Sequence, residues 1–257
     1  MIRLIASDLD GTLLDEMGRL PDGIFDRIRL LKERGVHFAA ASGRQYGNLR
    51  RLFFPVRDDI AYLCENGAYV VAGGQETARC FPRAMAEEII RDILAASMEV
   101  LISVPETSYL LSSAGKAYTD DITYRLRNTV TVIDDPLPLA DGFIKLSGYH
   151  PEGVADRAAP LQEKWKNRLH VDVAGAKWLD FTLENKGTGI AALCRSLGVS
   201  PDDTAAFGDQ YNDLSMLQAV GHPFLMENAP AGLKAMGFPP CRSVTQIIDQ
   251  ILREARP

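Results

Sequence analysis

Asp8-Leu9-Asp10-Gly11-Thr12-Leu13-Leu14 follows directly on the apolar segment from Ile2 to Ser7. That segment is short and rich in Ile and Leu, which favours a buried strand. Two carboxylates therefore stand just beyond the carboxyl end of the first predicted strand. In open α/β sheets, ligands bind beyond the carboxyl ends of the strands. An Asp-x-Asp at such a place is by itself often only a turn or a helix cap, so further signals are needed.

The residues that follow alternate between helical and strand patterns. Pro21 to Arg34 carries apolar residues at helical spacing, and Gly35 comes where such a helix would end. Two apolar runs, Val36 to Ala41 and Ala61 to Cys64, favour strands. A β-α-β-α-β order predicts a parallel sheet covered by helices.

The middle of the chain has a different pattern. Gly73-Gly74 separates two short runs and indicates a hairpin. Residues 84–98 and 151–166 predict amphipathic helices. Short apolar runs between and after these helices predict strands at 100–104, 109–112, 143–148, 170–173 and 178–183. Strands that follow one another closely favour antiparallel pairing, so this part is predicted to be α+β.

After Lys186 the first pattern returns. We expect a helix over 188–197, a strand over 204–207, a helix from Asp213, a short strand over 224–226 and a final helix over 244–254. The fold class is therefore α/β, with a Rossmann-like parallel-sheet core interrupted by an inserted α+β domain. The predicted bounds are residues 1–82 and 184–257 for the core and 83–183 for the insertion.

Composition narrows the classes of function. The chain has 257 residues and a net charge of −6, which argues against nonspecific nucleic-acid binding. Its apolar runs are far shorter than the ~20 residues that span a bilayer, and the start of the chain does not look like a signal peptide. The four cysteines form no CxxC pair, which favours reduced thiols and a cytoplasmic location.

Polar residues follow predicted strands or open predicted helices in four places. They are Asp8 with Asp10, Ser42-Gly43-Arg44, Lys186, and Asp209 with Asn212 and Asp213. Topology would bring all four to one edge of the sheet. Carboxylate oxygens are ligands that Mg²⁺ prefers, and Mg²⁺ bridges readily to phosphate oxygens. A lysine and a serine hydroxyl add donors for an anion. The set suits phosphoryl transfer through an aspartyl-phosphate, which needs a nucleophile, an acid/base and positive charge.

At this point the motifs resemble a known family. Asp8-Leu9-Asp10-Gly11-Thr12 is similar to the first motif of the haloacid dehalogenase (HAD) superfamily. Ser42-Gly43-Arg44, Lys186 and Gly208-Asp209-Gln210-Tyr211-Asn212-Asp213 resemble the second, third and fourth motifs. Glu65-Asn66-Gly67-Ala68 resembles a segment of the Cof-type, sugar-phosphatase-like branch, whose members carry a large C2-type (C2B) cap between the second and third motifs.

The resemblance implies a role for each matching residue. Asp8 would be the nucleophile and Asp10 the general acid and base, with its backbone carbonyl on Mg²⁺. Ser42 and Lys186 would hold the transferring phosphoryl group. Asp209 would bind Mg²⁺, with Asp213 as a further ligand or a support behind it. The residues expected to contact phosphate or substrate are Gly43, Arg44 and Asn212.

Two departures from the family pattern stand out. Met226-Glu227-Asn228-Ala229 carries Glu227 where the branch commonly has Gly, which would add bulk and negative charge at the rim of the site. Gln210-Tyr211 replaces the small and acidic pair often seen inside the fourth motif. Neither change removes a catalytic group.

The expected function is thus a Mg²⁺-dependent phosphatase of small phosphorylated metabolites, in particular sugar phosphates. Its partner would be a small phosphate ester, with no nucleic acid and no membrane, and the chain would act as a monomer or homodimer. A phosphomutase on hexose phosphates and a noncatalytic sugar-phosphate sensor stay open as alternatives. A dinucleotide-binding oxidoreductase is disfavoured, because Gly11 stands alone where a glycine-rich turn is required.

Overall fold

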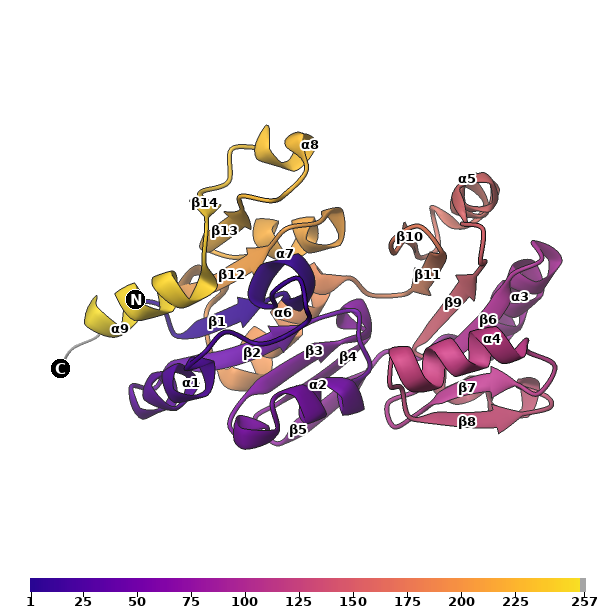
Figure 1. Cartoon of the computed structure of the whole chain (residues 1–257), viewed down its shortest axis with the longest axis horizontal. Coiled ribbons are helices and arrows are strands. Elements are labelled where there is room, and N and C mark those ends of the chain that lie inside the picture. The colour runs from indigo at the N-terminus through magenta and orange to yellow at the C-terminus, as the bar shows by residue number, and fades with distance from the viewer. Residues whose placement is uncertain (255–257) are drawn as a thin grey trace. The chain divides into compact units, whose positions relative to one another are not determined.

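The computed structural model describes residues 1–254. The chain folds into two compact units. The core unit joins Met1–Arg44, Leu49–Thr77 and the chain from Asn185 onward. The cap unit joins Gln45–Asn48 to Ala78–Glu184. The predicted core segment 184–257 ends in residues 255–257, which lie outside the described part. Figure 1 shows the course of the chain through both units.

The core unit is built on an eight-stranded sheet with the order β14-β13-β12-β1-β2-β3-β4-β5. Neighbours from β14 to β3 pair in parallel, and β4 runs antiparallel to β3. The strands are β1 (Leu4–Ser7), β2 (His37–Ala41), β3 (Ala61–Cys64), β4 (Tyr69–Ala72), β5 (Gln75–Ala78), β12 (Thr204–Gly208), β13 (His222–Met226) and β14 (Pro240–Cys241). The parallel α/β sheet predicted from the sequence is confirmed.

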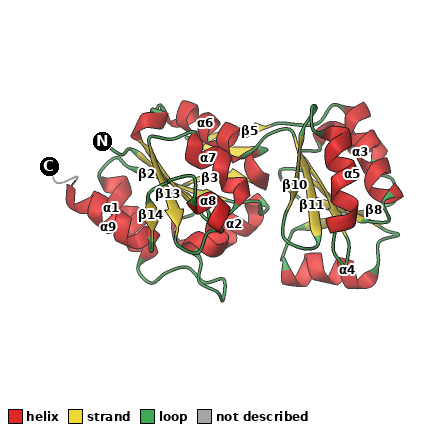
Figure 2. Cartoon of the chain, turned by 90° about the horizontal axis from the view of Figure 1, so that it is seen from above, coloured by secondary structure: helices red, strands yellow, loops and turns green. Residues whose placement is uncertain are grey.

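Helices cover both faces of the core sheet (Figure 2). On one face α6 (Lys186–Leu197) and α7 (Leu214–Gln218) pack over a buried apolar cluster that includes Leu4, Leu63 and Leu193. On the other face α1 (Ile24–Glu33) contacts β2 and α9 (Val244–Glu254). The remaining helices and helical turns are α2 (Tyr46–Leu52), α8 (Ala231–Lys234), η1 (Leu9–Leu13), η2 (Phe54–Val56), η3 (Glu65–Gly67), η6 (Pro201–Asp203) and η7 (Tyr211–Asp213).

The cap unit holds a six-stranded sheet with the order β10-β11-β9-β6-β7-β8. Its strands are β6 (Glu99–Ser103), β7 (Ser108–Leu111), β8 (Val130–Ile133), β9 (Lys145–Tyr149), β10 (His170–Val173) and β11 (Trp178–Thr182). All pairs are antiparallel except β7 with β8. The helices α3 (Arg83–Ala95) and α5 (Ala155–Trp165) cover one face (Figure 2). Shorter helical segments are α4 (Lys116–Asp120), η4 (Asp121–Arg125) and η5 (Leu137–Gly142).

Most predicted elements lie within a few residues of those observed, and the differences are local. The sequence pattern predicts no element between residues 113 and 142, whereas the structure has α4 and β8 there. A five-residue helix is too short to show helical periodicity. The run Val130-Thr131-Val132-Ile133 does favour a strand by its β-branched residues, but it forms the edge of the cap sheet and is only partly buried. Among residues 1–254, no helix combines the length and apolar character needed to cross a membrane.

Substitution of Leu193 tests how much the buried apolar cluster beneath α6 contributes to the free energy of unfolding. Its side chain is fully buried, whereas Leu30 on α1 is 41% exposed. We expect Leu193→Ala to lower the free energy of unfolding by about 2–5 kcal/mol, because burial is lost and a cavity remains. Leu30→Ala, the matched control, should change it by less than about 1 kcal/mol. Urea denaturation of both variants measures the difference, and equal losses would contradict this packing.

Candidate active site

A buried ammonium group joins three segments of the core unit. Lys186 is the first residue of α6, and its side chain is fully buried. Its Nζ donates to Asp8 Oδ1 at 2.6 Å and to Asp213 Oδ1 at 2.5 Å. Asn185 caps the same helix by accepting from the backbone N–H of Thr188. A buried lysine without partners would be very costly, so these two carboxylates are what allow its charge to stay there.

Asp213 is held on both of its oxygens. While Oδ1 accepts from Lys186, Oδ2 accepts from the backbone N–H groups of Asp209 and Gln210 at 2.9 and 3.0 Å. The turn can close this tightly because the preceding residue is Gly208. A Cβ at Gly208 would lie 2.4 Å from the Cβ of Asp213. The Asp213 carboxylate therefore fixes the end of β12 relative to α6.

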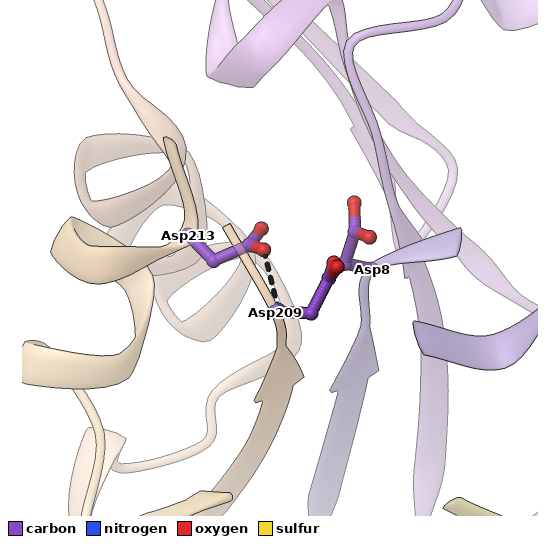
Figure 3. Close-up of side chains that lie close together, drawn as sticks. All are labelled: Asp8, Asp209 and Asp213. Carbon is purple, nitrogen blue, oxygen red and sulfur yellow. Dashed lines mark hydrogen bonds between the residues drawn. The ribbon is translucent and has the colours of Figure 1, made fainter. Parts of the chain in front are cut away.

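Asp209 follows β12 as Asp8 follows β1, and the strands are neighbours (Figure 3). Its Oδ1 accepts from the Thr12 hydroxyl at 3.1 Å. Its Oδ2 accepts from the side-chain amides of Gln210 and Asn228 at 3.1 and 3.2 Å. Gly11 passes so close that a Cβ there would lie 2.4 Å from Asp209 Oδ2, and its φ is +82°. The first motif thus needs glycine at this position for both space and backbone conformation.

Burial and neighbouring charges shift the pKa values of this cluster. Burial is the largest influence on Asp8 and raises the pKa of its carboxyl to about 7, although Lys186 opposes the shift. Burial also raises the pKa of Asp209. For Lys186 burial disfavours the charged form, but Asp213 and Asp8 outweigh it and raise the pKa of the ammonium. The site therefore carries an excess of carboxylates that one ammonium does not balance.

The donor set fits a small divalent cation. Asp8, Asp209 and Asp213 each offer a carboxylate oxygen, and the three oxygens lie within 4.8 Å of one another. All three residues are buried. Figure 3 shows that their side chains lie close together. Hard oxygen ligands of this kind suit Mg²⁺. A divalent cation would also reverse the effect of burial on Asp8, because it favours the ionised carboxylate.

Asp10 is not part of this buried cluster. Its side chain is 61% exposed, and both of its oxygens accept from the guanidinium of Arg44, through Nε at 2.9 Å and Nη2 at 2.5 Å. Arg44 follows β2, and its backbone N–H donates to the buried Ser42 hydroxyl at 3.2 Å. In this structure the first and second motifs are therefore linked by the Asp10–Arg44 pair.

The turn after β3 lies beside the second and fourth motifs. Gly43 is close to Asn66, whose amide oxygen accepts from the Asn212 side chain at 3.4 Å. Asn66 and Gly67 both have positive φ, at 56° and 102°. A Cβ at Gly67 would lie 2.2 Å from the backbone oxygen of Asn185, next to Lys186. This turn therefore packs directly against the start of α6.

The structure thus groups the expected residues in two sets. Asp8, Lys186, Asp209 and Asp213 form the buried cluster, and Asp10 pairs with Arg44 beside Ser42. Sequence reasoning did not assign roles to Thr12, Asn66 or Asn228, although each lies inside a quoted motif. Glu227 adds charge as expected, but that charge is paired, because both of its oxygens accept from Arg242 Nε at 2.9–3.0 Å.

Comparisons with known proteins agree with this geometry. A family model described as haloacid dehalogenase-like hydrolase matches residues 5–237. An Escherichia coli protein named 5-amino-6-(5-phospho-D-ribitylamino)uracil phosphatase YbjI is 27% identical, over 100% of this chain and 98% of the relative. An Escherichia coli protein named HMP-PP phosphatase is also 27% identical, over 91% and 88% of the two chains. The crystal structure of SMU.1108c from Streptococcus mutans superimposes with a TM-score of 0.85 at 25% identity, covering 98% of this chain and 100% of that one.

Gly67 provides a test of the contact with α6. Gly67→Ala places a methyl group against the Asn185 carbonyl at a positive φ, so we expect a loss of more than about 2 kcal/mol in the free energy of unfolding. Gly74 also has a positive φ, but nothing lies within 4 Å of its Cβ position. Gly74→Ala should therefore cost only about 1 kcal/mol. Thermal and urea unfolding of the two variants measure this, and similar losses would contradict the close approach.

Proposed function

We propose that this chain, which belongs to the haloacid dehalogenase-like hydrolase family, is a Mg²⁺-dependent phosphatase that works through an aspartyl-phosphate on Asp8. The family and the named relatives make it a phosphoric monoester hydrolase that acts on small phosphorylated metabolites. The observation that carries the finer proposal is the position of Asp8. Its carboxylate lies buried beside one ammonium and two further carboxylates at the end of β1.

In the proposed site, Asp8, Asp209 and the backbone carbonyl of Asp10 hold Mg²⁺. Asp213 supports them, because its oxygens already accept from Lys186 and from the backbone of the 209–210 turn. The ion supplies positive charge that screens the carboxylates from an anionic phosphate and stabilises charge on the transferring group. Lys186 and Ser42 bind phosphoryl oxygens from the protein side. Substrate contacts are assigned to Gly43, Arg44 and Asn212.

In the first step an oxygen of the Asp8 carboxylate attacks phosphorus, and the bond from phosphorus to the leaving oxygen breaks. Asp10 gives its proton to that oxygen, so an alcohol leaves instead of an alkoxide. Asp10 must therefore be protonated and released from Arg44 before this step, whereas the structure has the two paired. An incoming phosphate ester offers Arg44 another anionic partner and so favours that release.

In the second step water attacks the phosphorus of the aspartyl-phosphate. Asp10, now ionised, takes a proton from that water, and the bond from phosphorus to the Asp8 oxygen breaks. Inorganic phosphate leaves and the Asp8 carboxylate is restored. Its partner Lys186 stays in place through both steps, since its side chain is fully buried and bound at Nζ.

We further propose that the substrates are phosphorylated polyols or sugars and that the chain works in the cytoplasm. One named relative acts on a phosphorylated ribityl compound, which supports the first part. All four cysteines are unpaired, which supports a reducing compartment. A monomer or a homodimer stays the expected assembly.

Asp8→Asn tests the nucleophile. We expect hydrolysis of p-nitrophenyl phosphate in the presence of Mg²⁺ to fall to background, because an amide cannot form the phosphoenzyme. EDTA should abolish the activity of the unchanged chain, and added Mg²⁺ should restore it. Asp156→Asn, which changes an exposed aspartate of the cap unit, is the matched control and should keep full activity. Substantial turnover by Asp8→Asn would exclude the proposed nucleophile.

Asp10→Asn separates the two steps. A p-nitrophenolate leaving group needs little proton donation, whereas the attacking water still needs a base. We therefore expect a burst of about one p-nitrophenolate per chain followed by turnover slowed about 10²–10⁴-fold. With an alkyl phosphate no burst should occur, because the first step then lacks its acid. Stopped-flow absorbance measures the burst. Equal slowing for both substrates without a burst would contradict the dual role of Asp10.

A further inference from the structure

The two sheets of the described residues end in four edge strands. These are β14 and β5 in the core unit, and β10 and β8 in the cap unit. Natural edge strands commonly carry proline or charged side chains, because an unprotected edge can pair with another chain. Three of the four edges follow this rule, since Pro240 opens β14, Glu76 lies in β5 and Asp172 lies in β10. The exception is β8.

The edge strand β8 consists only of β-branched residues, Val130-Thr131-Val132-Ile133, with no charge, proline or glycine. Residues of this type favour extended strands. Figure 1 shows β8 at the margin of the cap sheet. Val132 is 56% exposed, and Thr131 is exposed as well. This edge is therefore unprotected and largely apolar.

The hydrogen bonds to the β7 segment show which backbone groups of β8 remain open. The carbonyl oxygens of Thr129 and Ile133 accept from backbone N–H groups of that segment. Backbone groups alternate in direction along a strand, so those of Val130 and Val132 face away from β7. Among the described residues β7 is the only strand paired with β8. The N–H and C=O groups of the two valines are thus available to a further strand.

The residues that flank β8 carry opposite charges. Arg127 precedes the strand, and Asp134 and Asp135 follow it. An antiparallel second copy brings the basic end of each strand beside the acidic end of the other, whereas a parallel copy would bring like charges together. Antiparallel pairing of identical strands also has two-fold symmetry, so the assembly closes after two chains. The segment is therefore complementary to itself.

We propose that the chain forms a homodimer in which the β8 strands of two copies pair antiparallel, joining the two six-stranded cap sheets edge to edge. A second copy is favoured over a peptide of another protein, because the segment supplies both the open edge and the charges that match it. The inference goes beyond the phosphatase proposal and does not depend on it. None of the residues proposed for catalysis lies in β8.

One register fits the open backbone groups best. It places Thr131 opposite Thr131 of the second copy and each Val130 opposite a Val132. The open backbone groups of the valines then bond to each other, and Thr131 occupies the non-hydrogen-bonded position at the two-fold axis. A register with Val132 opposite Val132 would instead place Val130 against Asp134, an apolar side chain against a charge.

Val132→Lys tests the interface by sedimentation velocity of the full chain at about 1–100 μM. We expect the unchanged chain to form a reversible dimer with a Kd in the micromolar range, because short interfaces bind weakly. Val132→Lys brings two ammonium groups to the shared edge, so the Kd should rise at least about tenfold. Val173→Lys is the matched control, since Val173 is 49% exposed on β10, the other edge of the same sheet. It should leave the Kd unchanged.

Thr131→Cys tests the register. It is made in a chain whose exposed Cys80 is changed to Ser, because that thiol could form other crosslinks. Cysteines opposite each other in a non-hydrogen-bonded pair are close enough for a disulfide. Oxidised glutathione should therefore convert this variant to a covalent dimer, seen on a non-reducing gel and reversed by dithiothreitol. Asp172→Cys, at an exposed position of β10, is the control and should stay monomeric on the gel.

The outcomes decide the proposal without any measurement of phosphate release, so they are independent of the phosphatase proposal. An unchanged chain that stays monomeric up to about 100 μM, or a dimer that Val132→Lys leaves intact, overturns the inference. Melting temperatures show whether Val132→Lys folds. If it does not, Thr131→Cys decides instead, and failure of that variant to form a covalent dimer overturns the inference.

Discussion

The site depends on one buried charge, the ammonium of Lys186. It must have carboxylate partners, because a fully buried lysine is otherwise neutral or unstable. Its bonds to Asp8 and Asp213 therefore hold together the end of β1, the turn after β12 and the start of α6. Asp213 carries this constraint further, since its second oxygen binds the backbone of Asp209 and Gln210. The same contacts of Lys186 with Asp8 and Asp213 therefore set the geometry of the buried cluster and stabilise the core unit. Breaking either contact would disturb the cluster and lower the stability of the core unit.

The buried cluster also has more negative than positive charge. Three carboxylates face one ammonium, which makes the site attractive to a divalent cation and, once that charge is added, to a phosphate. Gly11 and Gly208 let the backbone approach closely enough for the carboxylates to converge. Net charge over the whole chain is −6, yet the local arrangement is suited to an anionic ligand.

Much of this could be predicted from the sequence, because the signals are local. The apolar runs before Asp8 and Asp209 are strands in the structure, and parallel neighbours necessarily end at one edge. The Asp10–Arg44 pair could not be predicted, since it depends on which rotamers two exposed side chains adopt. Thr12 and Asn228 donate to Asp209 from other segments, 197 and 19 residues away in the chain, and nothing in their spacing signals either contact.

The most direct test of this account is the chemical state of Asp8 during turnover. Asp10→Asn protein is mixed with p-nitrophenyl phosphate and Mg²⁺, quenched in acid, digested, and analysed by mass spectrometry. The account predicts one added phosphoryl group on the peptide that contains Asp8, located on that residue by fragmentation and removed by hydroxylamine. Release of p-nitrophenolate with no phosphoryl group on this peptide, or with one on another residue, would contradict it.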